Sequence, residues 1–306
     1  MCLLNDVRKL AERVRGSSMD ALRRLIEQIE EDAALLEPDR LRERLEALDR
    51  LDAYFPEMNG AESDESAAAG LARRAGVIRG RLEAENRELY QAIRDEIRSG
   101  VGPEALLRWV ELLRKPGDAA TGMGFDFLDE LISGVLQLEE PEDGQLRRET
   151  EMVFYQPTPA RHIFDLMKLT ALTADDVFVD VGSGLGHVPL LVSICTAALA
   201  IGIELEGAYV ARARQCAERL GLTRTAFLQE DARAADFSSG TVFYLYTPFT
   251  GAMLRAVLDR LKHEAAMRRI RICTYGPCTS VIAEEGWLKA SSVPETDRIV
   301  LFSSCD

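Results

Sequence analysis

The residues best suited to bind a ligand follow an apolar run in the C-terminal half of the chain. Asp180 stands two residues before Gly182, and further glycines occupy positions 184 and 186, just before an apolar helical pattern. Glycines let the backbone approach a ligand closely, and the start of the next helix presents backbone N–H groups to it. Nicotinamide and flavin sites share such a loop, so the glycines alone do not identify the ligand.

Three acidic residues narrow the choice, because each one lies at or near the end of a predicted strand. The Asp180 carboxylate could meet the cationic amino group of a methionine moiety, whereas it would repel a pyrophosphate. Glu204 could accept hydrogen bonds from both ribose hydroxyls, and Asp231 could accept one from the adenine amino group. Each acid alone could equally cap a helix or face solvent, but three at successive strand ends predict S-adenosylmethionine as the cofactor. The cofactor residues predicted here are Asp180, Gly182, Ser183, Gly184, Gly186, Glu204, Asp231 and Ala232.

The elements around these residues alternate between strand and helix, the pattern of an α/β protein whose parallel sheet is covered on both faces. Strands are predicted at Val177–Val181, Ala200–Glu204, Thr225–Gln229, Val242–Tyr246 and Ile270–Tyr275, and helices at Val188–Ala198, Ala208–Leu220 and Ala252–Ala266. The last two apolar runs, Trp287–Val293 and Arg298–Ser303, are joined by only four residues. They must therefore pair antiparallel as a hairpin. A parallel sheet that ends in an antiparallel hairpin is the Rossmann-like arrangement of class I methyltransferases.

The N-terminal half is predicted to be all-α. Apolar residues recur at helical spacing over residues 3–14, 22–29, 41–51, 77–97 and 103–113, and Gly100 is expected to end the longest helix. The acidic, small-residue segment Asn59–Ala69 is expected to be a loop. The predicted domains are a helical bundle over residues 1–115, a linker with one helix over 116–150 and a cofactor-binding methyltransferase domain over 151–306. The apolar faces fit either a bundle core or a partner surface, so a homo-oligomer through the helical domain stays open.

Composition argues against several other classes of protein. The formal net charge of −14 disfavours a protein that depends on phosphate contacts, so a nucleic-acid partner is not expected. No apolar run is long enough to span a membrane, and the first ten residues lack the pattern of a secretory signal. The six cysteines include no Cys-x-x-Cys pair and only three histidines accompany them, so we expect reduced thiols, no metal and a cytoplasmic protein.

Two segments resemble the catalytic core of the non-SET histone lysine methyltransferases, the disruptor-of-telomeric-silencing type. They are Phe154–Pro159 and Asp176–Gly184, and the resemblance covers roughly residues 151–250 without the helical half. It implies that a loop containing Tyr155, Gln156 and Thr158 closes over the methionine end of the cofactor. The residues agree with a loop, because threonine followed by proline is typical of a helix N-cap with proline at N1. A plain connector with a packed tyrosine is the alternative.

The sequence departs from this family after the predicted fourth strand. The family has an asparagine lining the channel to the transferable methyl group, whereas Tyr246-Thr247-Pro248-Phe249 stands here. We expect Tyr246 to contact both cofactor and acceptor. The Thr247 hydroxyl, or backbone carbonyls near Pro248, could accept a hydrogen bond from an acceptor amine. Phe249 or Tyr155 could pack against the stem of the acceptor, and an apolar channel would favour its neutral amine. The alternative is that Tyr246 and Phe249 are core aromatics.

These observations leave three functions to compare. The first is a methyltransferase acting on an amino group of a protein, for which the resemblance favours a lysine-type substrate. The second is a methyltransferase of small molecules or nucleobases, with the helical half as a lid. The third is a cofactor-binding scaffold without transfer activity, which the missing asparagine would allow. A Rossmann oxidoreductase is disfavoured by Asp180 and by the terminal hairpin.

Overall fold

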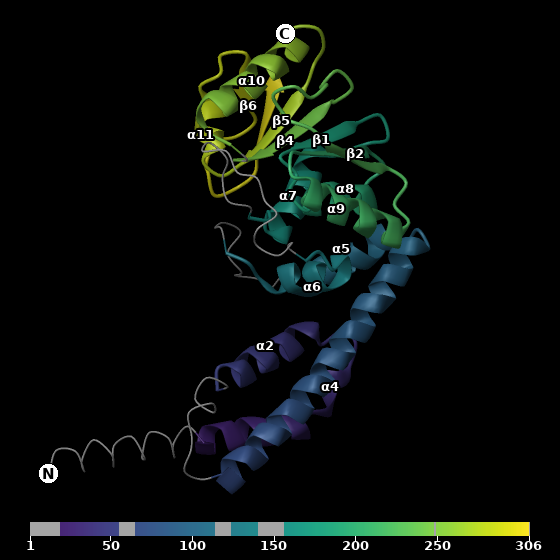
Figure 1. Ribbon diagram of the computed structural model, residues 1–306, viewed down its shortest axis with the longest axis vertical. Coiled ribbons are helices and arrows are strands. Elements are labelled where there is room, and N and C mark those ends of the chain that lie inside the picture. Colours follow the sequence, from purple (N-terminus) through teal and green to yellow (C-terminus); the bar gives the residue numbers. More distant parts are fainter. Residues whose placement is uncertain (1–18, 55–64, 114–123, 140–155, 248, 306) are drawn as a thin grey trace, which may run out of the picture. The chain divides into compact units, whose positions relative to one another are not determined.

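The chain divides into two compact units, Met1–Ala92 and Ile93–Asp306 (Figure 1). The computed structural model describes residues 19–54, 65–113, 124–139, 156–247 and 249–305. The boundary at Ala92 falls inside a long helix, whereas the domain boundaries expected from the sequence at residues 115 and 151 remain predictions.

The first unit is helical. It contains a helix over residues 19–31, a 3₁₀ turn at Ala33–Leu36, α2 (Leu41–Asp52) and the first part of α4 (Glu65–Arg98), which ends in the second unit. The helical stripes expected at 22–29, 41–51 and 77–97 are confirmed, and Gly100, at φ +88°, follows the end of α4 as predicted. The loop expected at Asn59–Ala69 is partly wrong, because α4 already begins at Glu65. The alanine run in that segment favours helix. The stripe at residues 3–14 lies outside the described residues.

An arginine lies in the interior of this first unit. Arg44 is fully buried, and its guanidinium donates to Asn86 Oδ1 at 2.6 Å and to the carbonyls of Leu35 at 3.0 Å and Glu37 at 2.6 Å. Burial lowers its pKa. These bonds join α2, the 3₁₀ turn and α4 across an otherwise apolar core, which includes Leu22, Ile26, Leu51, Leu71 and Leu82.

The second unit is built on a seven-stranded sheet whose strand order is β3-β2-β1-β4-β5-β7-β6. The strands are β1 (Val177–Val181), β2 (Leu199–Glu204), β3 (Thr225–Gln229), β4 (Val242–Tyr246), β5 (Arg271–Tyr275), β6 (Leu288–Ala290) and β7 (Val300–Ser304). Strands β1 to β5 pair parallel, and β7 pairs antiparallel with both β5 and β6. The predicted α/β Rossmann-like fold of class I methyltransferases, with its antiparallel hairpin after a helical N-terminal region, is confirmed.

The second unit also contains the helices α5 (Gly102–Leu113), α6 (Phe127–Leu136), α7 (Ala160–Thr170), α8 (His187–Cys195), α9 (Gly207–Leu220), α10 (Gly251–Ala265) and α11 (Cys278–Ala283). Helices α7, α8 and α9 lie on one face of the sheet, and α10 and α11 lie on the other (Figure 1). The sequence did not predict α11. It also overestimated the length of β6, so the connection between β6 and β7 is longer than the four residues expected. No helix among the described residues is both long and apolar enough to cross a bilayer.

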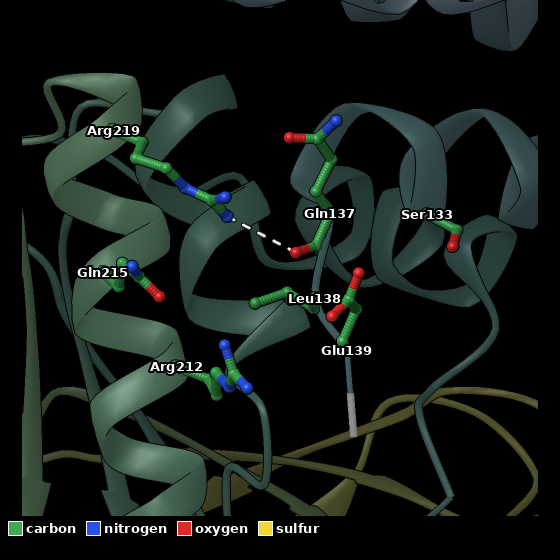
Figure 2. A pocket seen from close by; sticks show the side chains of 7 residues that line it. All are labelled: Ser133, Gln137, Leu138, Glu139, Arg212, Gln215 and Arg219. Atoms are coloured by element: carbon green, nitrogen blue, oxygen red, sulfur yellow. Dashed lines mark hydrogen bonds between the residues drawn. The ribbon is translucent and has the colours of Figure 1, made fainter. Parts of the chain in front are cut away.

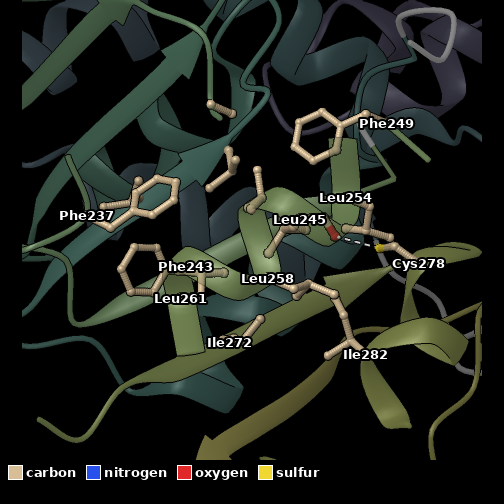
Figure 3. Close-up of a cluster of buried hydrophobic side chains, with 14 of the residues drawn as sticks. Phe237, Phe243, Leu245, Phe249, Leu254, Leu258, Leu261, Ile272, Cys278 and Ile282 are labelled. Carbon is tan, nitrogen blue, oxygen red and sulfur yellow. Dashed lines mark hydrogen bonds between the residues drawn. The ribbon is translucent and has the colours of Figure 1, made fainter. Parts of the chain in front are cut away.

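The main apolar core of this unit lies between α10 and the sheet (Figure 3). Phe243 and Leu245 of β4 are fully buried there against Leu258 and Leu261 of α10, and the Phe237 and Phe243 rings meet edge to face at 5.5 Å. Each such side chain contributes about 1.5–3 kcal/mol by burial. This packing holds the carboxyl ends of the parallel strands in register.

Candidate cofactor and acceptor site

The predicted site residues of the sheet meet at the carboxyl ends of the parallel strands. The chain order reverses between β1 and β4, since β2 and β3 lie on one side of β1 and β4 and β5 on the other. Ligands of open α/β sheets bind outside the carboxyl ends at such a switch point. The site therefore has two halves, one at the ends of β1 to β3 and one at the ends of β4 and β5.

The glycine loop follows β1 directly and turns into α8. Gly182, Gly184 and Gly186 have φ angles of +86°, +52° and +85°, which L-residues with side chains rarely adopt. The backbone N–H groups of Gly182 and Ser183 both donate to the Ile203 carbonyl, at 2.9 and 3.0 Å. A Cβ atom on Gly186 would lie 2.5 Å from the Phe227 ring, so helix packing also requires that glycine.

Glu204, at the end of β2, shapes this loop. Its carboxylate accepts from the backbone N–H of Gly184 and from that of Glu206, both at 2.8 Å. Its side chain is buried, and burial raises its pKa despite these bonds. The acid predicted to bind ribose therefore also fixes the backbone of the glycine loop.

Asp180 is the most deeply buried acid of the loop region, at 4% exposed. Burial raises its pKa well above the usual range, and the negative charge of Glu204 raises it further. Both effects disfavour the ionised carboxylate, and a cationic ligand placed beside it would oppose both. Two buried acids next to an open glycine loop therefore fit a ligand that carries positive charge, as S-adenosylmethionine does.

The end of β3 lies next to the end of β2, because the Glu230 N–H donates to the Glu204 carbonyl at 3.0 Å. Asp231 is partly exposed, and it is bound by Arg233, whose Nη2 lies 2.6 Å from Oδ2. This arginine holds the pKa of Asp231 below its usual value. The neighbouring Ala232 belongs to the apolar core. An adenine amino group at Asp231 would have to share the carboxylate with Arg233.

The segment before α7 lies near Asp180. Thr158 is buried, and its hydroxyl is hydrogen-bonded to the Tyr244 hydroxyl at 2.9 Å. Tyr244 is the register partner of Asp180, on β4. The predicted N-cap role of Thr158 is wrong, because α7 begins at Ala160, and the side chain of Thr158 points to β4 instead. Gln156 is exposed. Tyr155, predicted to cover the cofactor and to pack against the acceptor, lies outside the described residues.

The β4–β5 half carries aromatic and hydroxyl groups. Tyr275 contacts two other rings. Its ring centroid lies 4.7 Å from that of Tyr246 and 4.5 Å from that of His162 on α7, so the three rings form an aromatic trio. The Tyr246 hydroxyl is buried and has no hydrogen-bond partner within the described part of the chain. Burial raises the pKa of Tyr246 to about 12, so this phenol stays protonated at neutral pH.

Thr247 follows β4 directly and has φ +36°, a left-handed conformation that costs a β-branched residue about 1–3 kcal/mol. Its hydroxyl accepts from the Cys278 N–H at 3.1 Å and donates to the Tyr275 carbonyl at 3.4 Å. These bonds tie the end of β4 to the start of α11. The hydroxyl predicted to accept a hydrogen bond from an acceptor amine is therefore already engaged with the backbone.

Phe249 lies in the apolar core with α10 and is 5% exposed (Figure 3). This placement favours the alternative that the sequence left open for it, a core aromatic. Pro248 is outside the described residues. Sequence reasoning missed the neighbouring His162, Tyr244 and Tyr275. Tyr275 could have been found, because it ends a predicted strand at the same edge, whereas no sequence signal brings His162 of α7 to it.

A separate cavity of about 440 Å³ lies between the end of α6 and α9 (Figure 2). Arg212, Gln215 and Arg219 of α9 face Ser133, Gln137, Leu138 and Glu139, and Arg219 donates to the Gln137 carbonyl at 3.4 Å. None of the predicted site residues lines it, so it is separate from the predicted cofactor site. Within the described ranges, no cluster of three or more His, Cys, Asp or Glu side chains could hold a metal ion.

Comparison with known proteins agrees with this geometry. Residues 148–240 match the model of a family described as "Histone methylation protein DOT1". The sheet has the strand order of the class I S-adenosylmethionine-dependent methyltransferase fold, and residues 148–240 resemble the DOT1 family. The match covers under a third of the chain and ends before β4. It therefore includes the glycine loop and the acids of the β1–β3 half of the methyltransferase site, but not the β4–β5 half.

Several solved structures share the fold of the methyltransferase domain. An RNA methyltransferase from Salinibacter ruber in complex with S-adenosyl-L-homocysteine is 20% identical, covers 49% of this chain and 92% of that chain, and has a TM-score of 0.39. A putative S-adenosyl-L-methionine-dependent methyltransferase from Methanococcus maripaludis is 10% identical, with coverages of 47% and 84% and a TM-score of 0.40. No curated protein sequence matches the chain.

Proposed function

We propose that this methyltransferase transfers a methyl group from S-adenosylmethionine to an amino group of a protein, with a lysine-type side chain as acceptor. The observation that carries the proposal is the contrast at the carboxyl edge: buried acids beside the glycine loop, and uncharged aromatic rings at the ends of β4 and β5. The description of the matching family supports a protein acceptor, although the match itself ends before β4, and the lysine-type side chain follows from the resemblance seen in the sequence.

The β1–β3 half would hold the cofactor. Asp180 would bind the cationic amino group of the methionine moiety, and the loop at Gly182–Gly186 would approach the cofactor through its backbone. Glu204 has lone pairs left beyond its two backbone hydrogen bonds and would accept from the ribose hydroxyls. Asp231 would accept from the adenine amino group. Gln156 and Thr158, at the Asp180 side, would border the methionine end together with Tyr155.

The β4–β5 half would receive the acceptor. The bound cofactor supplies an activated methyl group and a sulfide leaving group that needs no acid. The transfer would exchange the S–C bond of the cofactor for a new N–C bond, and the amine would give up one proton to solvent. This chain would position the acceptor and exclude water. The rings of Tyr246 and Tyr275, with that of His162 beside them, would form an aromatic wall that favours the neutral amine. The Tyr246 hydroxyl, which has no partner among the described residues, could accept a hydrogen bond from an N–H of that amine and so orient its lone pair.

The first experiment is calorimetric titration of the full chain with S-adenosylmethionine and S-adenosylhomocysteine, beside Gly184→Arg. Gly184 has φ +52° and donates its N–H to Glu204, so an arginine there should abolish binding while circular dichroism shows that the fold persists. Absence of binding to wild-type protein would refute the cofactor assignment.

The second experiment uses methyl-labelled S-adenosylmethionine with separate pools of acceptors: a protein extract, lysine-containing peptides, RNA and small amines. Label in protein, located on lysine by mass spectrometry, is the expected result. Label only in RNA or small molecules would contradict the proposed substrate class. Tight cofactor binding without label in any pool would instead favour a cofactor-binding scaffold.

A further inference from the structure

Helix α6 lies outside the family match, yet it contacts the start of α7. That helix follows the segment Gln156–Pro159, which is called the cofactor segment below because it contains residues predicted to bind the cofactor. The Asp129 carboxylate of α6 accepts from the Ala160 N–H at 2.6 Å through Oδ1, and from the Asp126 N–H at 2.7 Å through Oδ2. Ala160 is the first residue of α7, and its N–H has no partner inside that helix. A carboxylate from a different helix thus does the capping that the preceding threonine was predicted to do.

The first turn of α7 is held at two more points. The Arg161 guanidinium lies 3.3 Å from the Asp126 carboxylate, with the arginine side chain only 8% exposed. The next residue, His162, lies against the Tyr275 ring of β5. Three consecutive residues of α7 are therefore fixed from α6 and β5, and both of those elements are outside residues 148–240.

The opposite end of α6 is also anchored. Arg94 Nη1 of α4 donates to the Gly134 carbonyl at 2.7 Å, and the Leu136 carbonyl accepts from Arg219 Nη2 at 3.2 Å and from Cys216 Sγ at 3.3 Å, both on α9. Because its C-terminal end is tied to α4 and α9, α6 presents Asp129 from a support that does not depend on α7. The carboxylate can therefore impose a position on α7 instead of following it.

The position of α7 determines where the cofactor segment Gln156–Pro159 lies. Thr158, two residues before α7, is bonded to Tyr244, and Tyr244 is the register partner of Asp180. The segment is therefore on the Asp180 side of the switch point, where the methionine end of the cofactor is proposed to bind. Glu204 and Asp231, proposed for the ribose and adenine, lie on the other side of β1, on and beyond β2 and β3.

We infer that Asp129 is a positioning residue for the methionine end of the cofactor, acting through the first turn of α7 and the segment Gln156–Pro159. This inference rests on the proposed function, because it presumes that S-adenosylmethionine occupies the switch point. It assigns to α6, a helix outside the family match, a part in building the cofactor site. Asp129 itself does not touch the cofactor.

Asp129 is partly buried, and burial raises its pKa to about 6, an effect that the charge of Asp126 reinforces and the bonds from Ala160 and Asp126 oppose. At pH 7.5 the carboxylate is thus ionised and able to accept both N–H bonds. All binding measurements are therefore made at pH 7.5, where the wild-type cap is complete.

The test compares two ligands on wild type, Asp129→Ala and Asp129→Asn. S-Adenosylhomocysteine carries the amino acid end, whereas 5′-methylthioadenosine lacks it and keeps the ribose and adenine. We expect Asp129→Ala to bind S-adenosylhomocysteine about 5- to 10-fold more weakly, less than the full effect of one lost charge-assisted hydrogen bond because Asp129 acts through α7, and to bind methylthioadenosine within about 2-fold of wild type. Asp129→Asn, which keeps one acceptor oxygen and the same shape, should recover part of the loss. The control Glu130→Gln removes an exposed charge from the same turn and should change neither affinity.

The outcomes separate the inference from its premise. Equal affinities of wild type and the two Asp129 variants for S-adenosylhomocysteine would overturn it. Equal loss for both ligands would also overturn it, because that pattern indicates a general loss of structure. If Asp129→Ala does not fold, Asp129→Asn alone decides by the same ratio of affinities. Failure of wild type to bind either ligand refutes the proposed function itself and removes the inference with it.

Discussion

The two halves of the carboxyl edge bury different kinds of polar group. At the ends of β1 and β2, Asp180 and Glu204 are buried acids whose pKa values are raised by burial, so a cationic ligand would stabilise their ionised forms. At the ends of β4 and β5, the polar groups are neutral. The Thr247 hydroxyl is satisfied by backbone groups, and only the Tyr246 hydroxyl has no partner among the described residues.

This difference indicates that the β1–β3 half should contribute most of the free energy of cofactor binding, whereas the β4–β5 half should mainly hold the acceptor in place. A buried acid without its cation is costly, so the β1–β3 half should gain free energy when a cation binds. The β4–β5 half is already internally bonded and should change little on ligand binding. Substitutions in the first half should therefore alter affinity, and those in the second half should alter stability or turnover.

The largest effect is expected at Asp180. Asp180→Ala should weaken the binding of S-adenosylmethionine about 100-fold or more, because the cationic amino group loses a buried charged partner, worth about 3 kcal/mol. Isothermal calorimetry measures this directly, with Asp175→Ala, an exposed acid just before the strand, as the matched control. Affinities within about threefold of each other would show that Asp180 is not the partner of the cation.

Thr247 should affect stability and leave affinity unchanged. Thr247→Val keeps the β-branched shape, and hence the same backbone cost at φ +36°, but leaves the buried Cys278 N–H without its acceptor. The free energy of unfolding should fall by about 2 kcal/mol in urea titrations, and Thr247→Ser should lose about half of that or less. If the valine variant is as stable as wild type, or if its cofactor affinity changes, the β4–β5 half does not differ from the β1–β3 half in the way described.

Tyr246 should affect turnover alone. Tyr246→Phe removes a buried hydroxyl that has no partner in the described structure, so stability should stay the same or rise slightly. The rate constant kcat for methyl transfer should fall about tenfold if the hydroxyl orients the acceptor amine, at unchanged cofactor affinity. Tyr54→Phe, which removes the same group from the first unit, is the control. Unchanged kcat would remove this hydroxyl from the acceptor site.

The smallest effect expected is a pH dependence of the cofactor half. The folded pKa values of Asp180 and Glu204 lie above their unfolded values, so their stabilising contribution is complete below the usual carboxyl range and is lost as pH rises through the raised values. A cationic ligand favours the ionised acids, so its affinity should increase as pH rises through the same window. Calorimetry at several pH values on wild type and Asp180→Asn tests this, and an equal slope in both would contradict a role for Asp180.

The comparison also explains why the two halves differed in how well they could be predicted. In the β1–β3 half, the predicted residues lie at or just after the end of an apolar run that the sequence identifies as a strand; these residues are Asp180, the glycines and Glu204. Because parallel strands end at the same edge, their positions in the sequence are enough to predict that they lie together. The trio of His162, Tyr246 and Tyr275 comes from α7, β4 and β5, and no local pattern joins these elements. The role of Thr158 was misjudged for the same reason, because its partner Tyr244 is 86 residues away.

The sequence by itself determined the α/β order, the bounds of most strands and the acids of the cofactor half, because hydrophobic periodicity and glycine conformation act over a few residues. Only the tertiary structure decided that Phe249 is buried in the core, that Thr247 is bonded to the start of α11 and that Asp129 caps α7 from another helix. These outcomes depend on which elements pack side by side. A buried hydrogen-bond donor pairs with an acceptor that the tertiary structure brings close to it. The spacing of residues along the sequence does not specify which acceptor that is.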